Sequence, residues 1–331
     1  MKTRILTRSG LELTELGFGA AGIGNLLQST TNRAAEAAVT LAWENGIRYF
    51  DSAPHYGAGL SERRLGSALH DLPADNRVLS TKVGRVLQPL SPGEPVDDFG
   101  YVSEAPFKRL YDYSYAGVMT SFEASLQRLG VASVDLLLMH DIGELTHGDE
   151  HAAVFKTALD GGYAAMAELR SQGRVKAIGL GVNEWQVCAA TLAHTDFDCF
   201  LVANCFTLLN NSITQGFTAQ CDQRNIDIIA AAPFNSGILA TGSKGAGAYF
   251  YGRASAEILT RVQELEAICA TFGVSLPAAA IQFPLRYDSV KSVVVGMTAT
   301  EQIQNNIDCY NEPIANEFWQ ELIDRRIIGP S

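Results

Sequence analysis

The segment "SLQRLGVASVDLLLMHD" (125–141) contains the alternation that predicts the fold. An amphipathic pattern ends at Gly130, a residue type common at the left-handed cap of a helix. An apolar run follows at residues 134–140, and it is continuous rather than alternating. Continuous runs are typical of strands whose two faces are both buried in a parallel sheet. We therefore interpret the segment as one helix and one strand of an α/β protein.

The same alternation extends over the whole chain. Apolar runs predict eight strands, at residues 13–19, 46–52, 77–83, 134–140, 175–182, 197–204, 226–233 and 290–296. Helical patterns accompany them at residues 32–45, 61–70, 115–129, 160–172, 184–194, 212–224, 254–272 and 276–286. Because no shift in composition and no linker divides these units, we expect one domain over residues 1–331, a closed (β/α)8 TIM barrel. Two further helices, at residues 300–309 and 316–326, would complete the chain.

Three connections are longer than the rest, at residues 84–114, 141–159 and 234–255. Each follows a predicted strand, so each would lie at the C-terminal mouth of the barrel, where the active sites of this architecture are found. Long loops at that mouth predict a covered pocket.

Composition and charge argue against several classes of protein. Of the 331 residues, 47% are hydrophobic and 18% are charged, a balance typical of globular proteins. The formal net charge of −11 argues against a nucleic-acid partner, because phosphates would be repelled. No run approaches the ~18 apolar residues of a membrane span. The N-terminal "MKTRILTRSG" lacks the apolar segment of a secretory signal, so we expect a cytoplasmic protein without membrane attachment. The sequence indicates no particular oligomeric state.

The cysteines also point to a reducing environment. There are six, none in a Cys-x-x-Cys pair, and most lie within apolar segments. This pattern predicts buried, reduced thiols rather than a disulfide or zinc framework.

Polar residues stand at the ends of three consecutive predicted strands. Asp51 ends the second strand, Lys82 lies near the end of the third, and His140 ends the fourth. Neighbouring strands of a barrel bring these ends together, and the loop after the second strand can place Tyr56 over them. Asp51 would keep Lys82 charged, and this charge is expected to lower the pKa of the phenol from about 10. Tyr56 could then carry a proton near neutral pH.

The sequence here resembles the aldo-keto reductases along nearly its whole length. The segments that carry the resemblance, in the family's order, are "FDSAPHYG", "SERRLG", "LSTKVGR", "SLQRLGVASVDLLLMHD", "RVKAIGLGVN" and "VVVGMTATEQIQNN". The resemblance implies that Asp51, Tyr56, Lys82 and His140 are the catalytic tetrad. It assigns proton transfer to Tyr56, orientation of the substrate oxygen to His140 and tuning of the phenol to the other two.

The resemblance also implies a nicotinamide dinucleotide bound across the barrel mouth without a Rossmann fold. Asn183 matches the contact to the nicotinamide carboxamide, and a loop at 234–239 resembles the one that crosses the pyrophosphate. Residues 296–306 resemble the adenosine clamp at a helix start. The full set of implied cofactor contacts is Gly19, Ala20, Ala21, Asp51, Asn183, Phe234, Ser236, Gly237, Leu239, Gly296, Thr298, Gln302, Asn305 and Asn306.

Departures from the family pattern bear on the cofactor. Members that prefer NADPH place a lysine near the position of Gly296 and an arginine near that of Gln302, and neither residue is cationic here. Without them a 2′-phosphate forfeits charge-assisted bonds of roughly 1.5–3 kcal/mol each, so we expect NAD, with NADP possible but less favoured. The family's glutamine on the sixth strand corresponds to Ala203. Its stacking aromatic corresponds to Ala231, which leaves Phe234 or another loop aromatic as the replacement.

Two motifs suggest other chemistry but lack its context. "GFGAAG" (17–22) has the spacing of a dinucleotide-binding fingerprint, yet the helical pattern starts only near residue 32 and the acid about 20 residues on, Glu36, lies inside that helix. "HGDEH" (147–151) pairs two histidines, but a glycine beside the first, a loop setting and the lack of a third ligand favour a solvated loop. We therefore expect no Rossmann fold and no metal site.

The substrate is expected to contact His55, Tyr56, His140 and Asp141. Within the family, residues 112–130 and the pair at 140–141 resemble a branch that includes L-fucose or D-threo-aldose 1-dehydrogenases and pyridoxal 4-dehydrogenase. That resemblance implies oxidation of a cyclic hemiacetal, such as L-fucose, L-galactose or D-arabinose, to a lactone, with Tyr56 as the base. The alternatives are a pyridoxal 4-dehydrogenase, an NADPH-dependent carbonyl reductase and a non-catalytic cofactor-sensing subunit.

Overall fold

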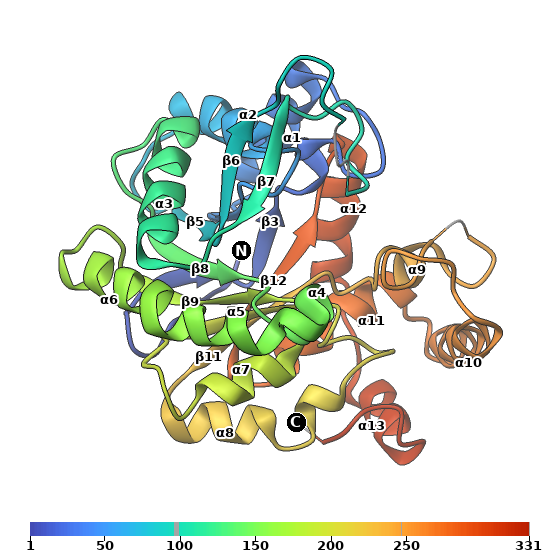
Figure 1. The fold of residues 1–331 in the computed structure, drawn as a ribbon. Coiled ribbons are helices and arrows are strands. Elements are labelled where there is room, and N and C mark those ends of the chain that lie inside the picture. Colours follow the sequence, from blue (N-terminus) through green and yellow to red (C-terminus); the bar gives the residue numbers. More distant parts are fainter. Residues whose placement is uncertain (96–98, 246, 331) are drawn as a thin grey trace.

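The computed structural model describes residues 1–95, 99–245 and 247–330. Eight parallel strands close into a barrel in chain order, with the last strand pairing to the first. Helices surround the strands, as the (β/α)8 prediction requires (Figure 1). The barrel strands are β3 (Leu16–Gly19), β4 (Tyr49–Asp51), β5 (Val78–Val83), β8 (Leu136–His140), β9 (Ala177–Val182), β10 (Cys199–Ala203), β11 (Asp227–Ala231) and β12 (Val290–Gly296).

The register of the strands places the polar strand ends at one rim. Gly19 pairs with Asp51, and Lys82 pairs with Leu138, two residues before His140. His140 in turn pairs with Gly181 on β9. Because all these pairings are parallel, the residues lie at the C-terminal ends of adjacent strands.

The helices bury one face against the barrel and form the main core with it. Within the described residues, no single helix has the length and apolarity to cross a membrane; the helices Ala256–Phe272 and Leu276–Gln282 have them only as a pair, which is bent by 99°. The helices that match predicted patterns are α1 (Asn32–Glu44), α2 (Leu60–His70), α3 (Tyr115–Leu129), α6 (Tyr163–Ser171), α7 (Trp185–Thr191), α8 (Phe217–Arg224), α10 (Ala256–Phe272), α11 (Leu276–Gln282), α12 (Thr300–Asn311) and α13 (Asn316–Asp324).

An antiparallel hairpin adjoins the N-terminal end of the barrel, formed by β1 (Thr3–Ile5) and β2 (Glu12–Thr14). Leu6, Leu11 and Leu13 of this segment are buried in a second core cluster together with residues inside the barrel. The prediction of one strand over residues 13–19 was therefore wrong, because the chain leaves the hairpin and starts β3 beyond Glu15. Glu15 lies between the hairpin and β3, and its carboxylate accepts a hydrogen bond from Arg4 Nε at 2.7 Å.

Two of the long connections contain regular structure that the sequence did not predict. The first forms a hairpin of β6 (Arg85–Pro89) and β7 (Phe107–Tyr111). The second forms α4 (Glu144–His147), a 3-10 turn and α5 (His151–Thr157), which continues through a π-helical turn (Ala158–Gly162) into α6. The described part of the third contains the short α9 (Ile238–Thr241), which the sequence did not predict either. Each follows a barrel strand, as expected.

The two motifs with competing interpretations are resolved by this fold. Residues Gly22–Gly24 form a 3-10 turn after β3 in a closed barrel, so the Rossmann interpretation does not apply. The "HGDEH" segment is helical rather than a loop, which corrects that expectation. His147 Nε2 and His151 Nδ1 lie within hydrogen-bond distance of the backbone oxygens of Asp141 and Ile142. Within the described ranges, no group of three or more His, Cys, Asp or Glu side chains could hold a metal ion.

The cysteines lie where the apolar pattern predicted. Five of them are buried and one is half-buried. Burial raises the pKa of the Cys205, Cys221 and Cys269 thiols to about 12, so these side chains act as packing groups.

Candidate active site

A buried ion pair stands at the rim of the barrel. Lys82 Nζ donates to Asp51 Oδ2 at 2.6 Å and to the backbone oxygen of Ser52 at 2.9 Å. The Ser80 hydroxyl donates to the other Asp51 oxygen at 2.7 Å. The two charged side chains are 1% and 4% exposed, so their charges must be satisfied by each other and by these hydrogen bonds.

A glycine on the neighbouring strand makes room for the lysine. A Cβ atom added at Gly181 on β9 would lie 3.0 Å from Lys82 Cε. Contacts this short are rare, so a larger residue would displace the lysine stem. The apolar "AIGLGV" of β9 therefore includes a glycine that permits the position of the ammonium.

Tyr56 lies in the turn after β4 and lines a large cavity. The Lys82 ammonium stands over its ring, 4.8 Å from the centroid. The His140 ring lies edge-on, with centroids 6.0 Å apart and an interplanar angle of 88°. The structure thus brings together Asp51, Tyr56, Lys82 and His140, which the sequence had placed on separate segments.

The phenol of Tyr56 differs from expectation in one respect. Burial, followed by the negative charge of Asp51, raises its pKa well above 10, although Arg85 acts in the opposite direction. The sequence predicted a lowered pKa because it weighed only the ammonium and not the loss of water. In the ligand-free protein the phenol therefore holds its proton at neutral pH.

His140 is surrounded by cations. Burial lowers its pKa well below 6.5, and the positive charges of Arg85 and Lys82 lower it further. Arg85 Nη1 lies within hydrogen-bond distance of His140 Nδ1, and Arg85 Nη2 donates to Asp141 Oδ2 at 2.8 Å. The imidazole is therefore neutral at physiological pH.

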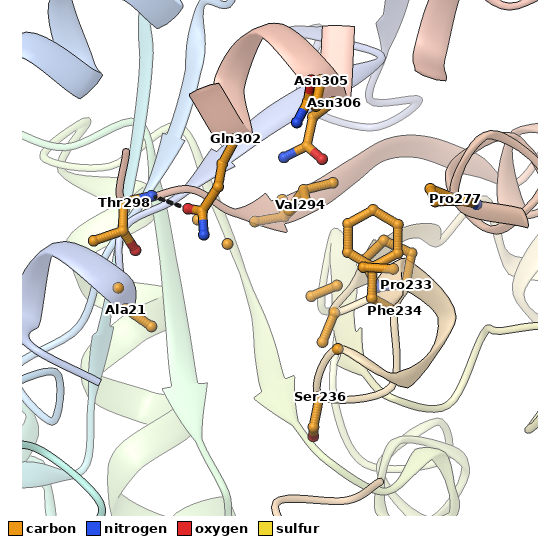
Figure 2. Close-up of a pocket in the computed structure, with 18 of the residues that line it drawn as sticks. Ala21, Pro233, Phe234, Ser236, Pro277, Val294, Thr298, Gln302, Asn305 and Asn306 are labelled. Atoms are coloured by element: carbon orange, nitrogen blue, oxygen red, sulfur yellow. Dashed lines mark hydrogen bonds between the residues drawn. The ribbon is translucent and has the colours of Figure 1, made fainter. Parts of the chain in front are cut away.

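The cavity has a volume of about 1110 Å³ and extends from the barrel mouth to α12. Asp51 and Tyr56 line one end, and residues of α12 line the other. Figure 2 shows Gln302, Asn305 and Asn306 projecting from α12, with Pro233 and Phe234 across from them. The predicted cofactor residues that line it are Gly19, Ala21, Asp51, Phe234, Ser236, Gly237, Gly296, Thr298, Gln302, Asn305 and Asn306.

The α12 end of the cavity is neutral or acidic. Gln302 Oε1 accepts hydrogen bonds from the backbone nitrogens of Thr298 and Ala299 at 2.9 and 3.3 Å, so it caps α12 (Figure 2). Asp308 and Glu312 also line this end. Among the described residues that line the cavity, none is a lysine or an arginine.

Three predicted cofactor residues, Ala20, Asn183 and Leu239, do not line the cavity. Ala20 and Leu239 are fully buried, and the Ala20 nitrogen donates to the backbone oxygen of Asp51. Asn183 donates to Asp141 Oδ1 at 3.3 Å and accepts from Asn204 Nδ2 at 3.2 Å. Their assignment as cofactor contacts stays a prediction.

A buried polar atom beside the cavity lacks a partner. Asn204 is fully buried next to the cavity residue Tyr251, and its Oδ1 has no hydrogen-bond partner in the described protein. A buried acceptor of this kind is costly unless a ligand supplies a donor. An amide N–H2 such as that of nicotinamide would satisfy it, so the residues present fit a nicotinamide cofactor.

Sequence reasoning assigned no role to three contributors to the site. Arg85 was within the quoted "LSTKVGR", but nothing in the sequence indicated that it meets His140, 55 residues away. Tyr251 lines the cavity, and its hydroxyl lies 3.5 Å from Asn204 Nδ2. It belongs to the long connection at 234–255, whose path the sequence does not determine. Asn204 directly follows Ala203, the position that corresponds to the family's glutamine, and only the fold shows its buried carbonyl.

Comparison with known proteins identifies the family of the chain. The model of the aldo/keto reductase family matches residues 15–325. The chain belongs to the aldo/keto reductase family. Pyridoxal 4-dehydrogenase from Microbacterium luteolum is 41% identical to this aldo/keto reductase, over 98% of each chain. D-threo-aldose 1-dehydrogenase from a Pseudomonas species is 38% identical, over 97% of this chain and 96% of its own.

Solved structures agree on the fold of this aldo/keto reductase. An aldo-keto reductase from Bacillus halodurans in its holo form superposes with a TM-score of 0.76 at 22% identity, covering 100% of this chain and 97% of that one. Together with the dehydrogenase relatives, the family assignment makes the protein an oxidoreductase with small-molecule substrates and a nicotinamide cofactor.

Proposed function

We propose that the protein is an NAD-dependent dehydrogenase that oxidises a cyclic hemiacetal at its anomeric carbon to a lactone. The observation that carries the proposal is the convergence of Tyr56, His140 and the Asp51–Lys82 pair beside the end of the cavity that Asp51 and Tyr56 line. The dehydrogenase names of the two relatives above support the direction of the reaction.

Each polar side chain of the site has a role in this reaction. The ionised form of Tyr56 accepts the proton of the anomeric hydroxyl as C1–OH becomes C1=O, and the neutral phenol returns a proton in the reverse direction. His140 is neutral and donates a hydrogen bond to the same oxygen. Lys82, held by Asp51, stabilises the ionised phenol as the proton arrives or leaves. The cofactor, when bound, supplies the acceptor for the hydride that leaves C1.

The preference for NAD rests on the α12 end of the cavity. An extra phosphate there would meet the amides of Gln302 and Asn305 and the carboxylates of Asp308 and Glu312. Without a cationic partner it would gain none of the charge-assisted bonds that make a phosphate contact strong. NAD is therefore favoured over NADP.

The surroundings of Tyr56 favour a flat aromatic substrate such as pyridoxal over an aldose. The Tyr56 ring lies 6.4 Å from that of Tyr101, stacked on it, and 6.1 Å from that of His55, measured between centroids. A sugar would instead need several free hydrogen-bonding groups. Asp141, the predicted contact for a hydroxyl, already has both carboxylate oxygens engaged by Arg85 and Asn183.

The proposal is tested with purified protein, NAD+ and a panel of pyridoxal, L-fucose, L-galactose and D-arabinose. We expect absorbance of NADH to rise with pyridoxal, together with one equivalent of a product two hydrogens lighter than the substrate. A faster reaction with an aldose would overturn the choice of substrate but not the chemistry. No turnover with any member, or an equal rate with NADP+, would contradict the proposed function or its cofactor.

A further inference from the structure

Arg85 is held rigidly beside His140. Its side chain is 4% exposed, and it is the first residue of β6. The preceding Gly84 has a φ of +101°, and a Cβ there would lie 2.3 Å from the Tyr113 ring. Only glycine fits this turn, so the backbone delivers Arg85 to one position.

The chemistry of the guanidinium determines which nitrogen of His140 carries the proton. A guanidinium has only donors, so the His140 Nδ1 that faces Arg85 must accept. In a neutral imidazole the proton is then on Nε2. His140 Nε2 lies 3.4 Å from Asp141 Oδ2, which is longer than an ordinary hydrogen bond, so its N–H stays available to an oxygen in the cavity.

We propose that Arg85 is a positioning residue that holds His140 in the Nε2–H tautomer, ready to donate to the substrate oxygen. The consequence for catalysis rests on the proposed function, whereas the tautomer itself does not. Asp141 completes the unit, because Oδ2 accepts from Arg85 and Oδ1 accepts from Asn183. Asp141 thus positions Arg85 and links it to the residue that matches the carboxamide contact.

The cations around His140 oppose a second proton on the ring, and the one carboxylate that would favour it, Asp141, is paired with Arg85. The ammonium of Lys82 reaches it from β5, and the rings of His55 and Tyr56 from the loop after β4. The Tyr113 hydroxyl donates to its backbone oxygen at 2.7 Å. With two cations nearby and one carboxylate already paired with Arg85, a second proton on the ring is disfavoured.

The tautomer can be measured without cofactor or substrate. The chain has six histidines, so 15N-histidine labelling gives a small set of ring signals in long-range 1H–15N spectra, and His140→Gln identifies those of His140. In the wild type we expect a protonated Nε2, an unprotonated Nδ1 and no titration between pH 6 and 8. A proton on Nδ1, or a ring that titrates with a midpoint above pH 6, would overturn the proposal.

Two variants separate the hydrogen bond from the charge. Arg85→Gln keeps a donor but adds an amide oxygen that can accept, so the Nε2–H tautomer should weaken yet remain the major one. Arg85→Met removes both donor and charge, so the two tautomers should mix. An unchanged spectrum in Arg85→Met would contradict the proposal. Circular dichroism reports whether each variant folds, and Arg85→Gln remains a test if Arg85→Met does not.

Kinetics then test the consequence for catalysis. We expect kcat to fall on the order of tenfold to a hundredfold in Arg85→Met and less in Arg85→Gln, with the Kd of NAD+ nearly unchanged. If Arg85 were only structural, Arg85→Met would lower kcat and weaken NAD+ binding together, in proportion to the stability that it loses. If no substrate is found, the proposed function fails, but the NMR result still decides the role of Arg85.

Discussion

The ammonium of Lys82 lies 2.6 Å from Asp51 Oδ2 and at the same time 4.8 Å from the centroid of the Tyr56 ring. The buried ammonium is thus neutralised by the Asp51 carboxylate and also lies over the ring of Tyr56. An ion pair of this kind adds little net stability, but removing one partner leaves an uncompensated buried charge.

Asp51→Asn should therefore lower both stability and activity. We expect the free energy of unfolding to fall by about 3–5 kcal/mol, measured by urea denaturation. The matched control is Asp160→Asn, which breaks the exposed pair with Lys156 and should change stability by no more than about 0.5 kcal/mol. Equal effects of the two substitutions would contradict the buried pair.

The raised pKa of Tyr56 predicts that oxidation speeds up with pH. Because the pKa lies well above 10, the ionised fraction of Tyr56 increases about tenfold for each unit by which the pH rises towards that pKa. We expect kcat/KM for oxidation to rise from pH 7 to 10, whereas kcat/KM for reduction should not rise over this range. In the apoprotein, the difference in ultraviolet absorbance between wild type and Tyr56→Phe reports the ionisation of the Tyr56 phenol. A midpoint below pH 9 would contradict the raised pKa.

Two histidines of the site, His140 and the half-buried His55, predict a loss of stability in mild acid. Burial lowers the pKa of both His55 and His140 well below 6.5. Below pH 6.5 the unfolded chain gains protons that the folded protein excludes, so stability is full above this pH and falls below it. The expected slope is up to about 1.4 kcal/mol per pH unit for each histidine. Urea titrations between pH 7.5 and 5 should show it.

Variants show which histidine causes the loss of stability in acid. His140→Gln should reduce the slope, whereas His70→Gln, at the exposed end of α2, should leave it unchanged. A stability that is constant down to pH 5 would show that neither imidazole is held neutral.

Cofactor preference should shift towards NADP when a cation is supplied at Gly296. A Cβ at this position meets no atom within 4 Å, so a longer side chain fits. We expect Gly296→Lys to raise the ratio of kcat/KM for NADP+ over NAD+ about tenfold, because it supplies one charge-assisted bond to the 2′-phosphate. Gly296→Met has a similar length without the charge and should leave the ratio unchanged. Equal ratios in both variants would remove the electrostatic argument.

Much of the fold could be predicted because each barrel strand is a continuous apolar run. The run at 13–19 misled, since Leu13 and Leu16 look alike in sequence but belong to a hairpin and to the barrel. The β6–β7 hairpin could not be predicted. Its strands are partly exposed and rich in Arg, Lys and Gln, and their pairing joins residues as far apart as Arg85 and Tyr111.

The candidate site was predictable where it depends on strand ends and not where it depends on loops. Asp51, Lys82 and His140 follow from the rule that parallel strands end at one rim. Arg85 and Tyr251 reach the site from a hairpin and a long loop, whose paths the sequence does not determine. The direction of the Tyr56 pKa was missed because burial cannot be read from charge spacing.

The central claim is that Tyr56 transfers the proton at a site where the cofactor binds independently of that step. Tyr56→Phe tests it most directly, with NAD+ binding followed by calorimetry and turnover followed by NADH absorbance in the same preparation. We expect the Kd of NAD+ to stay within about threefold while kcat falls at least about a hundredfold. A variant that turns over the substrate at the wild-type rate would contradict the account.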